Sequence, residues 1–338
     1  MSYSLLKKIL FRIEPEKAHY LALNSLHYLS RLGLSKLFPK VPLLPKQLMG
    51  LTFPNPVGLA AGFDKNGDYI DALAKLGFGF IEVGTITPKP QEGNPQPRLF
   101  RLDQQEALIN RLGFNNKGVA YLVKRLEQKR YQGIVGVNIG KNRDTPLEQA
   151  VDDDVYCFRS VAPHASYITI NVSSPNTPEL RKLQQAELLA PLLGALKKEQ
   201  ARFLETNNKY LPLVIKISPD LNEEELKQLA EHLLAEKIDA VIATNTTLSR
   251  PKLANLPEAN EAGGLSGRPL CSLSTEVIKT LHHLLKDKIP IIASGGIVSE
   301  KAALEKIAAG ASLVQIYTGL IYQGPWWIAS LIRKLAVH

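Results

Sequence analysis

The sequence predicts an α/β protein built as a (β/α)8 TIM barrel, preceded by an N-terminal extension of two helices. Eight short runs are almost continuously apolar, as expected of parallel strands covered by helices, and they span residues 57–63, 80–87, 134–140, 167–172, 213–218, 240–246, 290–297 and 313–320. Segments with the apolar spacing of helices follow the strands, at residues 69–76, 117–129, 146–162, 187–205, 222–236, 273–285, 299–309 and 325–335. This strict alternation favours a closed barrel, with a doubly wound open sheet as the competing fold.

Composition places the chain among globular proteins with a large core. Of the 338 residues, 45% are hydrophobic and 22% are charged, which argues against disorder. No run of eighteen apolar residues is present, and the first residues lack a signal-peptide pattern, so we expect an intracellular protein without a transmembrane helix. The two cysteines, Cys157 and Cys271, predict neither a disulfide framework nor a metal site.

The formal net charge of +9 restricts the choice of partners. No block of five basic residues is present, and aromatic residues are not interleaved with basic ones, so nucleic acid is not an expected partner. The charge favours an anionic membrane surface or an anionic substrate.

Residues 1–45 precede the first barrel strand and form the predicted extension, and the barrel occupies residues 46–338. The first helix carries an apolar stripe opposite its basic residues, made of Leu6, Ile9, Leu10 and Ile13. The second helix begins near Pro15 and has two apolar faces, one with Ala18, Leu21, Ala22, Leu29 and Leu32, the other with Tyr20, Leu23 and His27. A helix with two apolar faces needs two partners, here the barrel and either lipid or an apolar ligand. The alternative is that the two helices pack on each other.

Polar residues gather where the strands end, which is the functional rim of such a barrel. The long connections 88–116 and 248–270 also follow strands and are expected above this rim. The rim residues include five asparagines, Asn110, Asn138, Asn171, Asn176 and Asn245. A primary amide both donates and accepts hydrogen bonds, so the set suits a ring of alternating N–H and C=O groups, such as a pyrimidine or the edge of a flavin.

Glycine turns at the last two strands predict a phosphate site. Ser294-Gly295-Gly296 ends the seventh strand and Tyr317-Thr318-Gly319 ends the eighth, where barrels commonly bind phosphate through backbone N–H groups. Residues 263–267, Gly-Gly-Leu-Ser-Gly, add a third glycine-rich turn. The histidines fall in predicted helices or at the terminus, so none stands out as catalytic.

Together these motifs resemble the dihydroorotate dehydrogenase family over nearly the whole chain. The matching segments are 58–65, 82–88, 97–101, 110–116, 138–142, 171–177, 244–247 and 263–269. The serine motif 171–177 and the helical extension resemble the quinone-linked, membrane-associated branch, because soluble branches usually have cysteine as the base.

The resemblance implies oxidation of (S)-dihydroorotate to orotate in pyrimidine (UMP) biosynthesis, with FMN passing the electrons to a membrane quinone. Ser174 is implied as the base that removes the C5 proton, and the flavin accepts the hydride from C6. We expect Thr177 to serve as a proton relay and Phe114 as a wall that closes the site. The implied location is peripheral, at the cytoplasmic face of the inner (cell) membrane.

Matching motifs also imply the binding residues. Those for FMN are Ala61, Gly62, Phe63, Asp64, Lys65, Thr85, Asn138, Asn171, Lys216, Thr244, Gly267, Gly296, Tyr317 and Thr318. Those for dihydroorotate are Lys65, Asn110, Arg111, Leu112, Gly113, Phe114, Asn171, Asn176, Asn245 and Thr246. His19 and Arg101 are expected near the inner end of a quinone tunnel between the two N-terminal helices.

Two other functions remain open from the residues alone. One is an FMN barrel that uses a soluble acceptor, fumarate or NAD, which has no need of residues 1–45. The other is a phosphate-sugar lyase or isomerase barrel without flavin. A scaffold function is disfavoured by the polar rim.

Overall fold

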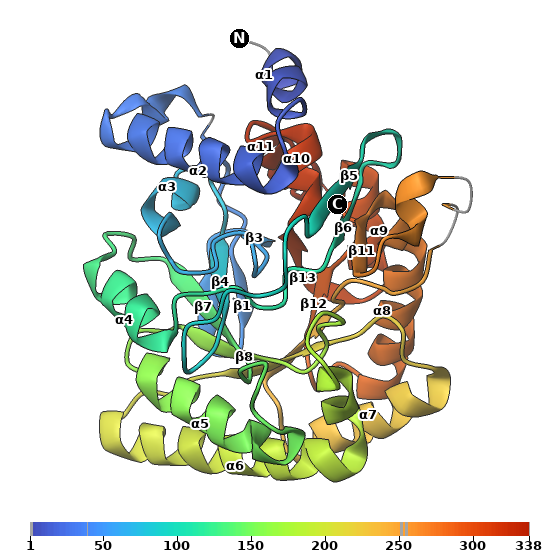
Figure 1. Ribbon diagram of the computed structural model, residues 1–338. Coiled ribbons are helices and arrows are strands. Elements are labelled where there is room, and N and C mark those ends of the chain that lie inside the picture. Colours follow the sequence, from blue (N-terminus) through green and yellow to red (C-terminus); the bar gives the residue numbers. More distant parts are fainter. Residues whose placement is uncertain (1–2, 39, 251–252, 254–255, 338) are drawn as a thin grey trace.

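The computed structural model describes residues 3–38, 40–250, 253 and 256–337, and it confirms the closed barrel. Eight parallel strands follow one another around it in the order β3, β4, β7, β8, β9, β10, β12 and β13, and β13 pairs with β3 to close the ring (Figure 1). Their bounds are β3 Val57–Leu59, β4 Phe80–Ile86, β7 Ile134–Ile139, β8 Tyr167–Asn171, β9 Leu213–Ile217, β10 Ala240–Ala243, β12 Ile291–Ser294 and β13 Ala311–Ile316.

Helices surround the barrel as predicted. They are α3 Ile70–Ala74, α4 Val119–Gln128, α5 Ala150–Val161, α6 Ala186–Asn207, α7 Glu223–Ala235, α8 Cys271–Leu285, α9 Glu300–Ala308, α10 Thr318–Gln323 and α11 Trp327–Leu335. Short 3-10 turns lie at Leu34–Leu37, Asp103–Gln105, Leu147–Gln149, Leu180–Gln184, Pro257–Asn260 and Arg268–Leu270. Asn222 caps α7 in a capping box, because its side chain accepts from Glu225 N at 2.9 Å and the Glu225 side chain accepts from Asn222 N at 2.8 Å.

Most of the strands end earlier than the apolar runs predict, and the residues left over form the mouth of the barrel. The run 240–246 becomes a strand only to Ala243, although Thr244 N still donates to Ser294 O at the end of β12. The run 313–320 is divided, because the strand ends at Ile316 and α10 begins at Thr318.

A hairpin that the sequence analysis missed covers the opposite end of the barrel. Its strands are β1 Lys46–Leu48 and β2 Leu51–Phe53, too short for a periodic signal. Phe53 is fully buried and its ring lies 5.1 Å from that of Phe80, within a cluster formed by the first residues of the barrel strands. The hairpin therefore closes the barrel floor.

The two connections predicted as loops contain a small antiparallel sheet. It consists of β5 Leu99–Leu102, β6 Ala107–Asn110 and β11 Gly264–Gly267, with β6 in the centre. Pairing aligns Asn110 with Gly264, so two segments 154 residues apart meet above the mouth. Residues 251–252 and 254–255 of the second connection lie outside the described residues.

The extension consists of α1 Tyr3–Leu10 and α2 Pro15–Arg31. Figure 1 shows α1 near α10 and α2 beside α3, and Tyr3 Oη donates to Ile321 O at 2.5 Å. On α2, Leu23 belongs to the main core and Ala18 is also buried, so each predicted face contributes one buried residue. No helix in the described ranges is long and apolar enough to cross a bilayer.

The stripe predicted on the first helix was partly wrong. Leu6 and Leu10 line an apolar cavity, but Ile9 is exposed, and Ile13 lies beyond the helix end. Lys7 faces the protein and donates to Tyr322 O at 3.2 Å. The helix therefore packs with a different rotation from the one its apolar spacing suggested.

The buried contact of Phe53 predicts a large contribution to stability. Phe53→Ala should lower the free energy of unfolding by about 3 kcal/mol or more, because it leaves a cavity in the barrel floor. Urea unfolding followed by circular dichroism measures this, with the exposed Leu43→Ala as control, for which a change within about 0.5 kcal/mol is expected. Equal stabilities of the two variants would contradict the assigned role of the hairpin.

Candidate active site

A polar cavity of about 130 Å3 opens at the carboxyl ends of the barrel strands. It lies on the side that the fold class makes functional. The predicted site residues that line it are Ala61, Gly62, Lys65, Thr85, Asn110, Leu112, Gly113, Phe114, Asn171, Ser174, Asn176, Lys216, Thr244, Asn245, Thr246, Gly267, Gly296, Tyr317 and Thr318. Residues from position 61 to position 318 thus converge on one cavity.

The rim asparagines are joined to one another by hydrogen bonds. Asn171 Nδ2 donates to Thr85 Oγ1 at 2.9 Å, and Asn245 Nδ2 donates to Asn171 Oδ1 at 3.3 Å. Asn176 and Asn110 form a second pair, in which Asn176 Nδ2 donates to Asn110 Oδ1 at 3.0 Å. These contacts fix the orientation of each amide and therefore which atom it can offer to a ligand.

A buried carboxylate lies beneath this layer. Glu82 on β4 is fully buried and accepts from Asn138 Nδ2 (2.9 Å) and Gln315 Nε2 (2.8 Å), as well as from Tyr167 Oη and Thr169 Oγ1. A buried charge needs such donors to offset its lost hydration. Asn138 is held by Glu82 and in turn accepts from Thr85 Oγ1 at 2.5 Å, so the carboxylate orients the first amide of the network.

Two polar groups above Glu82 are left available to a ligand. Lys216 is 6% exposed, and in the described ranges its ammonium has no hydrogen-bond partner. Burial lowers the pKa of Lys216, and the charge of Glu82 acts in the opposite direction. Gln315 Oε1 is buried and also lacks a partner among the described residues. A cation and an acceptor left without partners in a cavity are features of a site for a polar ring.

Lys65 lies at the other side of the cavity and contacts Asn115 Oδ1. Loss of hydration lowers the pKa of Lys65 to about 7. The nearby Arg98 lowers this pKa as well, whereas Glu16 raises it. The charge of Lys65 is therefore sensitive to its surroundings near neutral pH.

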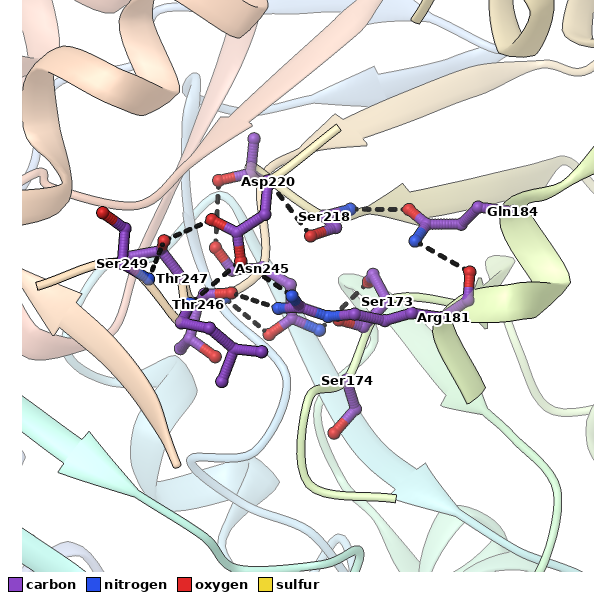
Figure 2. A network of polar contacts seen from close by, with 12 residues as sticks. Ser173, Ser174, Arg181, Gln184, Ser218, Asp220, Asn245, Thr246, Thr247 and Ser249 are labelled. Carbon is purple, nitrogen blue, oxygen red and sulfur yellow. Dashed lines mark hydrogen bonds and ion pairs between the residues drawn. The ribbon is translucent and has the colours of Figure 1, made fainter. Parts of the chain in front are cut away.

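The segment that carries Ser174 is held by an arginine that joins three strand ends. Arg181 Nε donates to Ser173 O (3.1 Å) after β8, and Nη2 donates to Thr246 O (2.8 Å) after β10. Asp220, which follows β9, pairs with Arg181 Nη1 at 2.7 Å. Figure 2 shows the guanidinium between these groups, with the side chain of Ser174 directed away from it.

The hydroxyl of Ser174 is therefore left for the cavity. Ser174 is 6% exposed, and its Oγ accepts a long contact of 3.3 Å from Asn176 N. Three residues on, Thr177 Oγ1 is buried and has no partner in the part of the chain that the structure describes. A second hydroxyl close in sequence is thus free to bind a water molecule or a ligand.

Glycines shape the far end of the cavity. Gly296 has φ +77° and a Cβ placed on it would lie 2.2 Å from Cys271 Cα, where α8 begins. Gly267 has φ +93°, and a Cβ there would lie 2.2 Å from Glu106 O. Thr318 and Ser266 face each other across this end, with their hydroxyls 2.9 Å apart. Backbone turns of this kind suit a phosphate.

Four predicted binding residues do not line the cavity. Arg111 points away, where it pairs with Glu261 and lies over the ring of Phe100. Asp64 instead accepts the backbone N–H groups of Asp68 and Tyr69. The other two are Asn138, which lies beneath the lining, and Phe63, which faces a neighbouring cavity.

Other lining residues were missing from the predicted list of binding residues, although Ser266, Ser294 and Gly295 belong to the glycine turns predicted for a phosphate. The residues missing from that list are Ala60, Ser266, Leu270, Ser294, Gly295, Ile297 and Gln315. Several adjoin predicted glycines and follow from the same turns. Gln315 carried its own signal, since it is a long polar side chain within the last apolar strand.

An apolar cavity of about 230 Å3 lies next to the polar one. Both N-terminal helices line it, with Leu6 and Leu10 from α1 and Ala18 and Ala22 from α2. The two helices are therefore not packed solely on each other. Tyr317 lines both this cavity and the polar one, so its ring forms part of the wall between them.

His19 and Arg101, the residues expected at a quinone tunnel, both line the apolar cavity. His19 Nε2 lies 2.9 Å from Phe63 O, and because a carbonyl only accepts, Nε2 carries the proton and Nδ1 is an acceptor. Burial lowers the pKa of His19 to about 4, so the ring is neutral at pH 7. Arg101 donates to the carbonyls of Leu10, Phe11 and Ile13 and thereby holds the turn between α1 and α2.

The close packing of Gly296 allows a test of whether the glycine turns of the cavity bind a phosphate. Gly296→Ala should lower the bound flavin per protein by about tenfold or more, because the new methyl group displaces the start of α8. Gly194→Ala is the matched control, since no atom lies within 4 Å of a Cβ at that position of α6. Flavin absorbance after gel filtration measures the outcome, and full flavin content in Gly296→Ala would contradict the assignment.

Comparisons with known proteins agree with this geometry. The family model described as "Dihydroorotate dehydrogenase" matches residues 43–338. A relative from Nitrosospira multiformis, named dihydroorotate dehydrogenase (quinone), is 55% identical over 99% of this chain and 96% of its own length. One of the same name from Burkholderia ambifaria is 56% identical, over 99% and 97%.

Solved structures show the same likeness. The crystal structure of DHODH from Eimeria tenella in complex with ferulenol has a TM-score of 0.85 and 40% sequence identity, and covers 94% of this chain and 90% of its own. The ligand-free enzyme from the same organism has a TM-score of 0.84. With the family model and these full-length relatives in agreement, the chain belongs to the dihydroorotate dehydrogenase family.

Proposed function

We propose that this chain is a quinone-dependent dihydroorotate dehydrogenase, which oxidises (S)-dihydroorotate to orotate with FMN as cofactor, and that Ser174 is its general base. One observation carries the proposal: two lysines, the linked asparagines and Ser174 meet at a polar cavity that adjoins an apolar one. FMN, when bound, accepts the hydride that leaves C6 of the substrate.

The polar cavity fits FMN at both ends. Lys216 and Gln315 offer an unpaired cation and an unpaired acceptor to the isoalloxazine ring, together with Thr85, Asn171 and Thr244. Gly267, Gly296 and Thr318 form the turns for the phosphate. With FMN bound, the ammonium of Lys216 would stabilise negative charge on the ring.

The substrate binds between this ring position and the loops of the mouth. Lys65 pairs with its carboxylate, and the amides of Asn110, Asn171, Asn176 and Asn245, with Thr246, bind the alternating N–H and C=O groups of its ring. Leu112, Gly113 and Phe114 cover it and exclude water. Arg111 contributes through its pairing with Glu261 rather than through direct contact.

Proton removal at C5 is the task of Ser174. A serine hydroxyl is a weak base, so it must be held in place and must pass its own proton on as it accepts the new one. Arg181 fixes the segment that carries Ser174. The unpaired hydroxyl of Thr177 is the next group in the relay.

The apolar cavity takes the quinone. It has room for a ring between α1 and α2, and one of its lining residues, Tyr317, also lines the polar cavity. A soluble acceptor such as fumarate or NAD has no need of an apolar cavity of this kind.

The same helices dock on the membrane. Eleven of the seventeen large hydrophobic residues that are exposed in the described chain lie within residues 1–45, among them Leu5, Ile9, Leu21, Leu32 and Leu37. Exposed apolar side chains on short helices favour burial at a lipid surface. Residues 1–45 therefore act as the quinone- and membrane-docking extension, at the cytoplasmic face of the membrane, and residues 46–338 as the FMN-binding barrel.

Ser174→Ala tests the base. The variant should keep its FMN but be reduced by dihydroorotate about 10²–10⁴-fold more slowly, which is the usual loss when a general base is removed. Anaerobic stopped-flow absorbance measures flavin reduction, with the exposed Ser330→Ala as control. A rate close to that of the unsubstituted protein would refute the role of Ser174.

Lys65 predicts a pH dependence for substrate binding. Its pKa of about 7 means that the ammonium is present below pH 7 and is lost as the pH rises through this value. Binding of anionic orotate should therefore weaken above pH 7, by up to about tenfold for each pH unit. Orotate titrations of the flavin spectrum between pH 6 and 8.5 measure this, and a constant dissociation constant over that range would contradict it.

A further inference from the structure

A buried ion pair connects the N-terminal extension to the loops above the active site. Glu16 on α2 and Arg98 before β5 are 6% and 8% exposed. They form a two-pronged contact, with Arg98 Nε 2.9 Å from Glu16 Oε2 and Nη2 2.7 Å from Oε1. Gln96 Nε2 also donates to Glu16, at 3.2 Å.

Such a pair is poor support for stability alone. Removing two charges from water is unfavourable, and well-packed apolar residues often stabilise a fold as much or more. The planar guanidinium, however, fixes its partners in both distance and angle. The two-pronged contact between Glu16 and Arg98 is thus suited to fixing α2 and the loop before β5 relative to each other.

The remaining nitrogen of the Arg98 guanidinium, Nη1, holds a turn of the loop above the active site. Nη1 donates to Glu92 O at 2.6 Å and to Asn94 O at 2.9 Å, so the same guanidinium that binds α2 also holds the 92–94 turn. Four of the five N–H groups that a guanidinium offers are used in these contacts.

Asn94 then reaches the segments proposed to bind dihydroorotate. Its backbone N donates to Leu112 O at 3.1 Å, and its Nδ2 donates to Arg111 O at 2.8 Å and to Asn176 O at 3.4 Å. A Cβ on Gly113 would lie 2.8 Å from Asn94 Nδ2, so this amide is packed directly against the 111–113 segment. The contacts therefore run from α2 through Arg98 and Asn94 to both substrate segments.

The same helix also faces the apolar cavity. His19 lies one turn beyond Glu16 and contacts Phe63 O at the inner end of that cavity. Residues three apart lie on one face of a helix. One face of α2 therefore carries both Glu16, which is connected to the substrate segments through Arg98, and His19, which lines the apolar cavity.

We propose that Glu16 and Arg98 are positioning residues for the substrate, so that the helix lining the acceptor cavity also sets the affinity for dihydroorotate. The proposal rests on the function proposed above, since it assumes that residues 111–113 and Asn176 bind dihydroorotate. Glu16 and Arg98 also have opposite effects on the pKa of Lys65, which Glu16 raises and Arg98 lowers. Loss of Glu16 therefore disfavours the charged form of Lys65, in addition to displacing the loops that bind the substrate.

The test uses the full-length, FMN-loaded protein with Glu16→Gln and Arg98→Lys. The first removes the charge while keeping the size of the side chain, and the second keeps the charge but loses the planar fork. The dissociation constant of orotate, read from the flavin spectrum, and the KM for dihydroorotate should each rise about tenfold, as expected when binding groups are displaced. The KM for a short-chain ubiquinone and the flavin reduction rate at saturating dihydroorotate should each stay within about threefold.

The chain offers a matched control in another two-pronged glutamate–arginine pair. Glu199 and Arg159 make contacts of 2.6 and 2.7 Å on the surface between α5 and α6. Glu199→Gln should leave orotate binding unchanged. Asn94→Ala removes the next link without touching the ion pair, and it should weaken orotate binding in the same way even if the Arg98 variant does not fold.

Several outcomes would overturn the proposal. If Glu16→Gln or Asn94→Ala binds orotate as tightly as the unsubstituted protein does, the ion pair only anchors α2 and does not position the substrate segments. A rise of the quinone KM alone would assign the pair to the acceptor cavity instead. If the unsubstituted protein binds no orotate, the proposed function fails, and that result is distinct from a failure of the pair.

Discussion

Closure of the barrel is the constraint on which the rest of the structure depends. Because β13 pairs with β3 and β9 with β10, no strand edge is left, and all eight carboxyl ends meet at one rim. Residues that are up to 258 positions apart, such as Ala60 and Thr318, thereby line one cavity. The buried carboxylate of Glu82 ties four of the strands together beneath it, through partners on β7, β8 and β13. The amides above therefore rest on a rigid layer.

The two cavities divide the chemistry by polarity. Charged and amide groups line the first, which suits a small anionic ring, and mostly apolar side chains line the second, which suits a quinone. Tyr317 lies between them, with its ring 5.3 Å from that of Phe63. Two separate cavities allow the substrate and the acceptor to bind at different sites. The contacts of α2 suggest that the two sides are nonetheless adjusted together.

Much of this could be predicted from the sequence, and the misses have physical reasons. The eight strands followed from apolar runs, the rim asparagines and glycine turns from the residues that end them, and the remaining site residues from the family resemblance. The β1–β2 hairpin and the β5–β6–β11 sheet could not, because three- and four-residue strands have no clear period and β11 pairs with a strand over 150 residues away. Arg111 was placed in the site by its motif, but Glu261 and Phe100 hold it outside, and such a partner is not visible in the local sequence. The ion pair of Glu16 and Arg98 joins residues 82 positions apart and escaped notice for the same reason.

The most direct measurement of the central claim is an anaerobic titration of the purified protein. If the lysines, the amides and Ser174 act together on one flavin, about one equivalent of dihydroorotate should bleach the flavin absorbance, and a ubiquinone analogue should then restore it. Purified protein that binds flavin but is not bleached by dihydroorotate would contradict the account.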